Sequence, residues 1–293
     1  MAGSGLAYVN VGRRRQHAFD ASFLGKTMAD RVTVNITSGV ADVRLSRPDK
    51  MNALDPAMFD ALLATCGGLS KDRGLRAVVL SGEGRAFCAG LDLNSFAAMK
   101  EGGIRHLEAR TQGISNGFQY AVMGWRELGV PVIAAVHGIA YGGGFQLALG
   151  ADVRFVAEDT RLSIMEIKWG IVPDMGGTVL MRHLASEDVI RELTYSGRVF
   201  SAEEARAYGF ATRVLADPRT EALALAHDIA EKNPDAIRAA KRLFNIAAAG
   251  SDAATCLLAE SREQARLIGS ANQTEAVLAN LEKRAPRFSD AAE

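Results

Sequence analysis

Two glycine-rich turns contain the groups in this chain that are best suited to chemistry. One is Gly142-Gly143-Gly144, which follows the apolar segment 132–136. Because glycine has no Cβ, the backbone there can approach a ligand closely, and a helix that starts at the turn offers free N–H groups. The other turn runs from Ser81 to Asp92 and contains further glycines. Two N–H groups directed at one carbonyl oxygen form an oxyanion hole, which stabilises a developing negative charge.

Two acidic residues downstream are candidates for proton transfer. Glu166 follows the apolar segment 162–165, where loss of water would raise the pKa of its carboxyl group. A surface charge on a loop is the alternative interpretation. Asp174 stands just before Gly176-Gly177-Thr178. It is either a second carboxylate of the same site or a cap for a helix that starts there.

The elements that would position these groups alternate between strands and helices. Period-two alternation and short apolar runs predict strands at 32–37, 40–45, 76–80, 132–136 and 153–156. Asp55-Pro56 is typical of a helix start, and Met58, Leu62, Cys66 and Leu69 then fall on one face. This alternation predicts an α/β fold with parallel strand pairing.

Later segments are mostly helical. Residues 94–129 are interrupted by glycines, and we expect helical segments with a mobile loop near a pocket mouth, or else an ordinary surface excursion. Ser201 to Glu204 form a capping-box pattern, and Gly209 suits the end of that helix. From Thr220 on we expect helices, broken at Asn233-Pro234 and near Gly250 and Gly269.

Composition argues against several classes of function. The 293 residues contain 34 lysines and arginines and 34 aspartates and glutamates, so no net field attracts nucleic acid or a membrane. No apolar run reaches the roughly 18 residues that span a bilayer. The widely spaced Cys66, Cys88 and Cys256 fit a reducing cytoplasm rather than a disulfide framework. Neither metal-ligand spacing nor a dinucleotide fingerprint is present, so we expect no metal and no separate cofactor.

The first 27 residues differ from the rest. They contain Arg13-Arg14-Arg15 and no acidic residue before Asp20. We expect residues 1–27 to be a disordered extension, or to result from an upstream start with Met28 as the alternative initiator. An arginine-rich, acid-poor organellar transit segment is the other interpretation.

From about residue 30 to 285 the chain resembles the crotonase superfamily, the enoyl-CoA hydratases and isomerases. The motifs that carry the resemblance are Arg47-Pro48-Asp49-Lys50-Met51-Asn52-Ala53-Leu54, Phe87 to Asp92, Gly142 to Gln146, Glu166 to Pro173 with Gly176-Gly177-Thr178, and Ser196-Gly197-Arg198 through Ala202-Glu203-Glu204-Ala205 to Gly209. The set is specific for the superfamily and less specific for the reaction.

The resemblance implies a spiral core of repeated ββα turns over residues 28–219. It also implies a C-terminal helical region over 220–293 that packs on neighbouring subunits. We therefore expect a homotrimer or a dimer of trimers that takes an acyl-CoA thioester as substrate.

The resemblance also assigns roles to residues of the two turns. The backbone N–H groups of Leu91 and Gly143 would form the oxyanion hole. Backbone at Lys50, Met51 and Ala89 would hold the coenzyme A moiety, with Asp92 and Gly142 as further substrate-binding residues. A solvated loop charge is the alternative interpretation of Lys50.

Gln146 is the main departure from the family pattern. The hydratases use two glutamates, the first of which maps onto Gln146 and the second onto Glu166. An amide cannot take a proton from water at neutral pH. We therefore expect an isomerase that shifts a double bond with Glu166 as acid and base. The alternatives are an enoyl-CoA hydratase in which Gln146 positions water, and a non-catalytic acyl-CoA-binding protein.

Asp174 completes the candidate catalytic residues, with Glu166 and Gln146. The dienoyl-CoA isomerases of the superfamily have a catalytic aspartate at this offset from the glutamate. They also have an aspartate at the position of Gln146, so the match is incomplete.

Overall fold

The computed structural model describes residues 31–92, 94–95 and 107–292. The extension predicted over residues 1–27 lies outside these ranges. Part of the loop predicted within 94–129 also lies outside them, and the described part of that segment contains the helix α3 (Gly117–Glu127).

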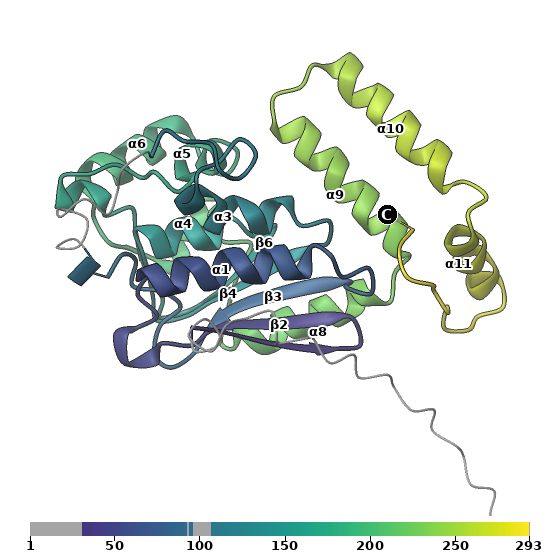
Figure 1. Ribbon diagram of the computed structural model, residues 1–293, viewed down its shortest axis with the longest axis horizontal. Helices are drawn as coiled ribbons and strands as arrows, with labels where there is room; N and C mark the ends of the chain where they lie inside the picture. Colours follow the sequence, from purple (N-terminus) through teal and green to yellow (C-terminus); the bar gives the residue numbers. More distant parts are fainter. Residues whose placement is uncertain (1–30, 93, 96–106, 293) are drawn as a thin grey trace, which may run out of the picture.

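A six-stranded sheet forms the centre of the fold (Figure 1). Its strands are β1 (Val32–Thr37), β2 (Val40–Leu45), β3 (Ala77–Gly82), β4 (Val132–Val136), β6 (Val153–Ala157) and β9 (Arg213–Leu215), in the order β1-β2-β3-β4-β6-β9. β1 and β2 form an antiparallel hairpin, and the other neighbours are parallel. The strands predicted from the sequence are all confirmed, with small shifts of their ends.

A second sheet has three short strands, β5 (Ile139–Tyr141), β7 (Arg161–Ser163) and β8 (Phe200–Ser201), in the order β5-β7-β8. β5 follows β4 and β7 follows β6, so a long strand of one sheet is followed by a short strand of the other. After β3, Cys88 likewise bridges to Ala140 in β5. These pairs and the helices between them form the repeated ββα turns that the resemblance implied.

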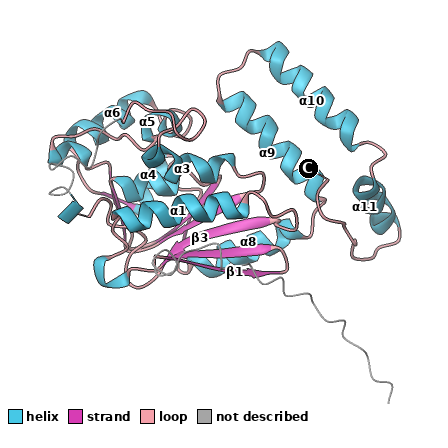
Figure 2. Cartoon of the chain, in the orientation of Figure 1, coloured by secondary structure: helices cyan, strands magenta, loops and turns pink. Residues whose placement is uncertain are grey.

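Helices lie on both faces of the large sheet (Figure 2). α1 (Pro56–Leu69), α3 and α4 (Gly143–Leu149) cover one face, and α8 (Pro218–Ala230) covers the other. Successive side chains of a strand point to opposite faces. In β3, Val78 and Leu80 therefore pack with the first group of helices, while Ala77 and Val79 pack with α8.

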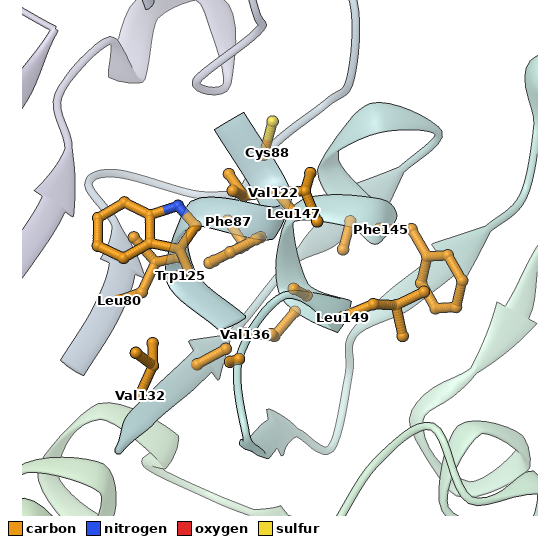
Figure 3. Packing of buried hydrophobic residues seen from close by; sticks show 14 of the residues in the cluster. Leu80, Phe87, Cys88, Val122, Trp125, Val132, Val136, Phe145, Leu147 and Leu149 are labelled. Carbon is orange, nitrogen blue, oxygen red and sulfur yellow. The ribbon is translucent and has the colours of Figure 1, made fainter. Parts of the chain in front are cut away.

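Figure 3 shows the larger core, where Leu80, Val132 and Val136 of the sheet pack near Trp125 of α3 and Leu147 of α4. Trp125 is completely buried. This packing fixes the start of α4, and with it the turn Gly142-Gly143-Gly144, against the sheet.

The remaining elements of the core are shorter. They are η2 (Pro48–Lys50), η4 (Glu166–Trp169), α5 (Gly177–Met181), α6 (Glu187–Ser196) and α7 (Ala202–Tyr208). α7 starts at a capping box between Ser201 and Glu204 and ends at Gly209, as predicted. Asp55 caps α1 by accepting a hydrogen bond from the Met58 N–H.

Three C-terminal helices extend away from the sheet (Figure 1). They are α9 (Pro234–Ala248), α10 (Ala253–Leu267) and α11 (Ala271–Leu281). The predicted breaks at Asn233-Pro234, Gly250 and Gly269 are confirmed. The division into residues 28–219 and 220–293 stays a prediction, and α8 packs on the sheet although most of it belongs to the second range.

Candidate active site

One cavity of about 430 Å³ brings most of the predicted site residues together. Those on its wall are Lys50, Met51, Ala89, Leu91, Asp92, Gly142, Gly143 and Glu166. Gln146 and Asp174 are not on the wall that the described residues form. Gln146 lies buried behind it in contact with Glu166, and Asp174 lies in the loop before α5, where its charge acts on Glu166.

The loop 47–54 forms one side of the cavity, and Asn52 ties it to the turn after β3. The Asn52 side chain donates to the carbonyl oxygens of Glu83 and Ala86 at 2.9 and 2.8 Å, and accepts from the Arg47 N–H at 2.8 Å. The Ala89 N–H also donates to the Met51 carbonyl oxygen at 2.9 Å. Lys50 on this loop is exposed and lines the cavity.

The two glycine-rich turns meet at the cavity. A methyl group placed on Gly90 would lie 3.5 Å from the Gly143 nitrogen and 2.5 Å from the Tyr141 carbonyl oxygen, so only glycine fits between them. Gly143 is the first residue of α4, where a helix has no internal partner for its N–H. Within the described residues, the N–H groups of Leu91 and Gly143 donate to no other group. Both are therefore available to a ligand, as an oxyanion hole requires.

Glu166 starts η4 and is 6 % exposed. The alternative that it is a surface charge is therefore wrong. Burial raises the pKa of its carboxyl group above the ordinary 4.5, and the negative charge of Asp174 acts in the same direction. A hydrogen bond from Gln146 opposes both effects. In the described part of the chain, Glu166 Oε2 is buried without a hydrogen-bond partner.

Gln146 connects three elements from its place in α4. Its Oε1 accepts the N–H groups of Met175 and Gly177 at 2.9 and 3.0 Å, and its Nε2 donates to Glu166 Oε1 at 2.5 Å. Two backbone donors need an oxygen opposite them, so this orientation of the amide is the one that satisfies every group. The side chain is 1 % exposed. The amide oxygen is therefore fully used by backbone donors, and the side chain does not line the described cavity, so it has no acceptor free to activate a water molecule there.

Asp174 does not cap α5, so that alternative is wrong. The N-cap of α5 is Gly176, which has no side-chain capping bond, and the Gly177 N–H is bound by Gln146 instead. Although the Asp174 side chain is exposed, nearby protein atoms limit the hydration of its carboxylate and raise its pKa.

Asp92 is committed to a structural contact. Arg47 Nη1 lies 2.6 Å from Asp92 Oδ2, and the Asn94 N–H donates to Oδ1 at 2.9 Å. Burial alone would raise the pKa of Asp92, but the Asn94 and Arg47 contacts outweigh it and lower the pKa. Asp92 therefore stays ionised and holds the loop 47–54 against the second glycine-rich turn.

Several wall residues were not predicted from the sequence. They are Asp49, Ala53, Gly90, Asn94, Tyr141, Met165, Trp169 and Ile171. Trp169 and Ile171 belong to the motif from Glu166 to Pro173, and they are 45 % and 40 % exposed where they line the cavity. An aromatic and an aliphatic residue next to a candidate carboxylate are the signal that could have identified them.

In the described ranges, no cluster of histidine, cysteine, aspartate and glutamate side chains could hold a metal ion. Within the same ranges, none of the helices combines the length and apolar character needed to cross a membrane.

Comparison with known proteins identifies the family. A sequence profile of the family described as Enoyl-CoA hydratase/isomerase matches residues 35–291. Methylglutaconyl-CoA hydratase of Mus musculus is 30% identical over 257 residues, which are 85% of this chain and 79% of the relative. Delta(3,5)-Delta(2,4)-dienoyl-CoA isomerase of the same organism is 33% identical over 220 residues, which are 71% and 67% of the two chains.

Solved structures agree with the sequence match. An enoyl-CoA hydratase from Bacillus anthracis superimposes with a TM-score of 0.79 at 31% identity, and the match covers 88% of this chain and 98% of that one. The profile spans most of the chain, and the relatives named as hydratases and isomerases match along it. This protein therefore belongs to the enoyl-CoA hydratase/isomerase family, the crotonase superfamily, and is an enzyme with the crotonase fold.

Proposed function

We propose that this enzyme shifts a carbon–carbon double bond in an unsaturated acyl-CoA, with Glu166 as the acid and base. The observation that carries the proposal is that the Gln146 oxygen is occupied by two backbone N–H groups, while its nitrogen donates to the buried Glu166 carboxylate. Coenzyme A enters as part of the substrate, and the proposed chemistry uses no other cofactor.

The thioester carbonyl would bind between the two glycine-rich turns. Its oxygen would accept the N–H groups of Leu91 and Gly143, which have no other acceptor in the described residues. Loss of one such donor typically raises a barrier by about 3 kcal/mol. Backbone around Lys50, Met51 and Ala89 lines the same cavity and would hold the coenzyme A moiety.

Glu166 would move one proton. Its Oε2 takes a proton from the α-carbon of a β,γ-enoyl thioester, and the electron pair of the broken C–H bond passes to the thioester oxygen, which gives a dienolate. The same carboxyl group then returns the proton to the γ-carbon as the thioester carbonyl re-forms, so the double bond moves to the α,β position and atoms and charge balance. The raised pKa of Glu166 suits a group that must both accept and release a proton.

Hydration would need a second group to activate water. Gln146 is an amide, and its oxygen already accepts two backbone N–H groups. Asp92 is held by Arg47. Asp49 also lines the cavity but is exposed, so among the described wall residues Glu166 is the buried carboxylate with an oxygen that has no partner. One carboxylate is enough for a double-bond shift.

The second candidate function is a double-bond shift over a longer conjugated system, as in a dienoyl-CoA. Asp174 is close enough for its charge to raise the pKa of Glu166, and its own pKa is raised as well. A relative named as a dienoyl-CoA isomerase matches 71% of this chain. Two carboxyl groups of this kind would exchange protons at opposite ends of a dienoyl chain.

Two substrates test the proposal in one assay. The purified enzyme is incubated with a β,γ-enoyl-CoA and, separately, with the α,β-enoyl-CoA of the same length, and the absorbance of the conjugated thioester is followed. The proposal expects a rise with the first substrate and little change with the second. A fall with the second and no rise with the first would identify a hydratase and contradict the proposal.

A further inference from the structure

We propose that Gln146 is a positioning residue that fixes the Glu166 carboxylate through Oε1 and leaves Oε2 as the single reacting oxygen. The inference rests on the proposed function, in which Glu166 is the base. It extends that function because it assigns a separate task to a side chain that does not line the cavity.

The two oxygens of Glu166 have different surroundings. Oε1 lies 2.5 Å from Gln146 Nε2, whereas Oε2 has no partner among the described residues. A methyl group on Gly142 would lie 3.4 Å from Oε1 and 3.9 Å from Oε2, so the carboxylate sits directly beside the turn that would bind the thioester. A proton taken from substrate would therefore go to Oε2.

The backbone of the next helix holds Gln146 in place. Met175 and Gly177 donate to its Oε1 from the start of α5, and a methyl group on Gly177 would lie only 2.7 Å from that oxygen. The amide cannot rotate without losing both bonds. The position of Glu166 in η4 is thus set by α4 and α5 together.

The hydrogen bond also acts on the charge of Glu166. It favours the ionised form and opposes the rise in pKa that burial and Asp174 produce. Asp174, in the loop before α5, is the charged group from a neighbouring element that acts on Glu166. Besides Glu166, the ionisable groups on the described cavity wall are Asp49, Lys50, Asp92 and Tyr141.

The test compares two substitutions at one position. Gln146→Met has a similar length but neither donates nor accepts, so both the bond to Glu166 and the bonds to α5 are lost. Gln146→Glu keeps an acceptor for Met175 and Gly177 but places a second carboxylate oxygen against Glu166. Gln273→Met on α11 is the matched control, since Gln273 accepts one N–H, from Gly269, far along the chain from the site.

Each variant is measured in two ways. The first is the pH dependence of kcat/KM with a β,γ-enoyl-CoA. Its acid limb, where activity falls as the base becomes protonated, reports the pKa of Glu166 in the free enzyme. A substrate-free infrared titration of the carboxyl band, with Glu166→Gln as the reference, gives the pKa of Glu166 even if the wild type does not catalyse the shift. Absence of activity in the wild type would thus contradict the proposed function and leave the inference testable.

For Gln146→Met we expect the acid limb and the infrared titration to move up by about one pH unit or more, since a hydrogen bond to the charged form is lost. We expect kcat to fall by about ten- to a hundredfold with a smaller change in KM. In Gln146→Glu two adjacent carboxylates share a proton, so both titrations again move up.

The alternative is that Gln146 only supports α5. Gln146→Met would then titrate like the wild type and like Gln273→Met, even if its kcat falls, and this result would overturn the inference. If Gln146→Met does not fold, a Gln146→Glu titration equal to that of the wild type would show that the two side chains do not interact and would likewise overturn it.

Discussion

The carboxyl group of Glu166 combines two properties that a proton-transfer group needs. It is buried beside the glycine turn of α4, and one of its oxygens has no competing partner in the described residues. Burial raises the pKa of Glu166, so its carboxyl group can hold the proton taken from the substrate until it is returned. These properties come from the fold around Glu166 and not from its type alone.

The pH dependence of the wild-type enzyme follows from this pKa. A base must be deprotonated in the free enzyme, so activity is present above its pKa and is lost as the pH falls through it. Because the pKa of Glu166 is raised, we expect the acid limb of kcat/KM to lie above the ordinary glutamate value of 4.5. Steady-state rates across the acid range measure it, with tryptophan fluorescence to confirm that the protein stays folded. An acid limb at or below 4.5 would show that burial does not raise the pKa of Glu166.

The loop 47–54 is the element whose position depends most on one side chain. Asn52 is fully buried, binds two carbonyl oxygens of the turn after β3, and has a positive φ of 54°. Asn52→Ala removes these bonds, and unsatisfied buried carbonyls cost about 1–3 kcal/mol each. We expect the variant to be less stable by about 2–6 kcal/mol and to have a raised KM for acyl-CoA, since Lys50 and Met51 move with the loop.

Chemical denaturation and initial rates measure these effects. Asn280→Ala on α11 is the control, since Asn280 is exposed and donates only to the Ala276 carbonyl oxygen one turn earlier. Equal stability of the two variants would mean that Asn52 does not hold the two loops together.

Local patterns predicted the strands and the helix ends because their causes are local. Period-two alternation at 32–37, the cap at Asp55 and the capping box at Ser201 each depend on a few neighbouring residues. The strands β5, β7 and β8 have only two or three residues, so no period is visible in them. Their pairing depends on where β4 and β6 place them.

The site could be predicted only in part, because some of its contacts join residues that are far apart in the sequence. Family motifs located Leu91, Gly143 and Glu166, and these residues do line one cavity. The contact between Gln146 and Glu166 joins residues of different elements, and no spacing rule shows it. Asp174 was assigned two roles from the sequence, and the structure removes the one that depends on local geometry, the cap.

The C-terminal helices show that helical periodicity does not reveal which face is inside. In α9, Lys241 is 7 % exposed, and it donates to Asp152 and to the Val130 carbonyl oxygen, both at 2.8 Å. Phe244, three residues later, is 74 % exposed. The Lys241 ammonium group therefore helps to attach α9 to the core, while the large apolar side chain of Phe244 faces outward.

This arrangement bears on the oligomeric state. Large apolar residues are exposed along the whole C-terminal region, among them Phe244, Leu257, Leu258, Ile268 and Leu281. Stable subunit interfaces are large and apolar, so we expect these helices to be covered in a trimer or a dimer of trimers. Light scattering on the eluting protein at micromolar concentration measures the mass. A monomer mass under these conditions would contradict the expectation.

The substitution Glu166→Gln tests the central claim most directly. It keeps the shape of the side chain and removes the group that takes and returns the proton, and general acid–base groups contribute about a hundredfold or more to rate. The measurement is kcat for conversion of a β,γ-enoyl-CoA, with binding of the same substrate determined separately. We predict a loss of at least about a hundredfold in kcat with binding retained. Turnover near that of the wild type would show that Glu166 is not the base and would contradict the account.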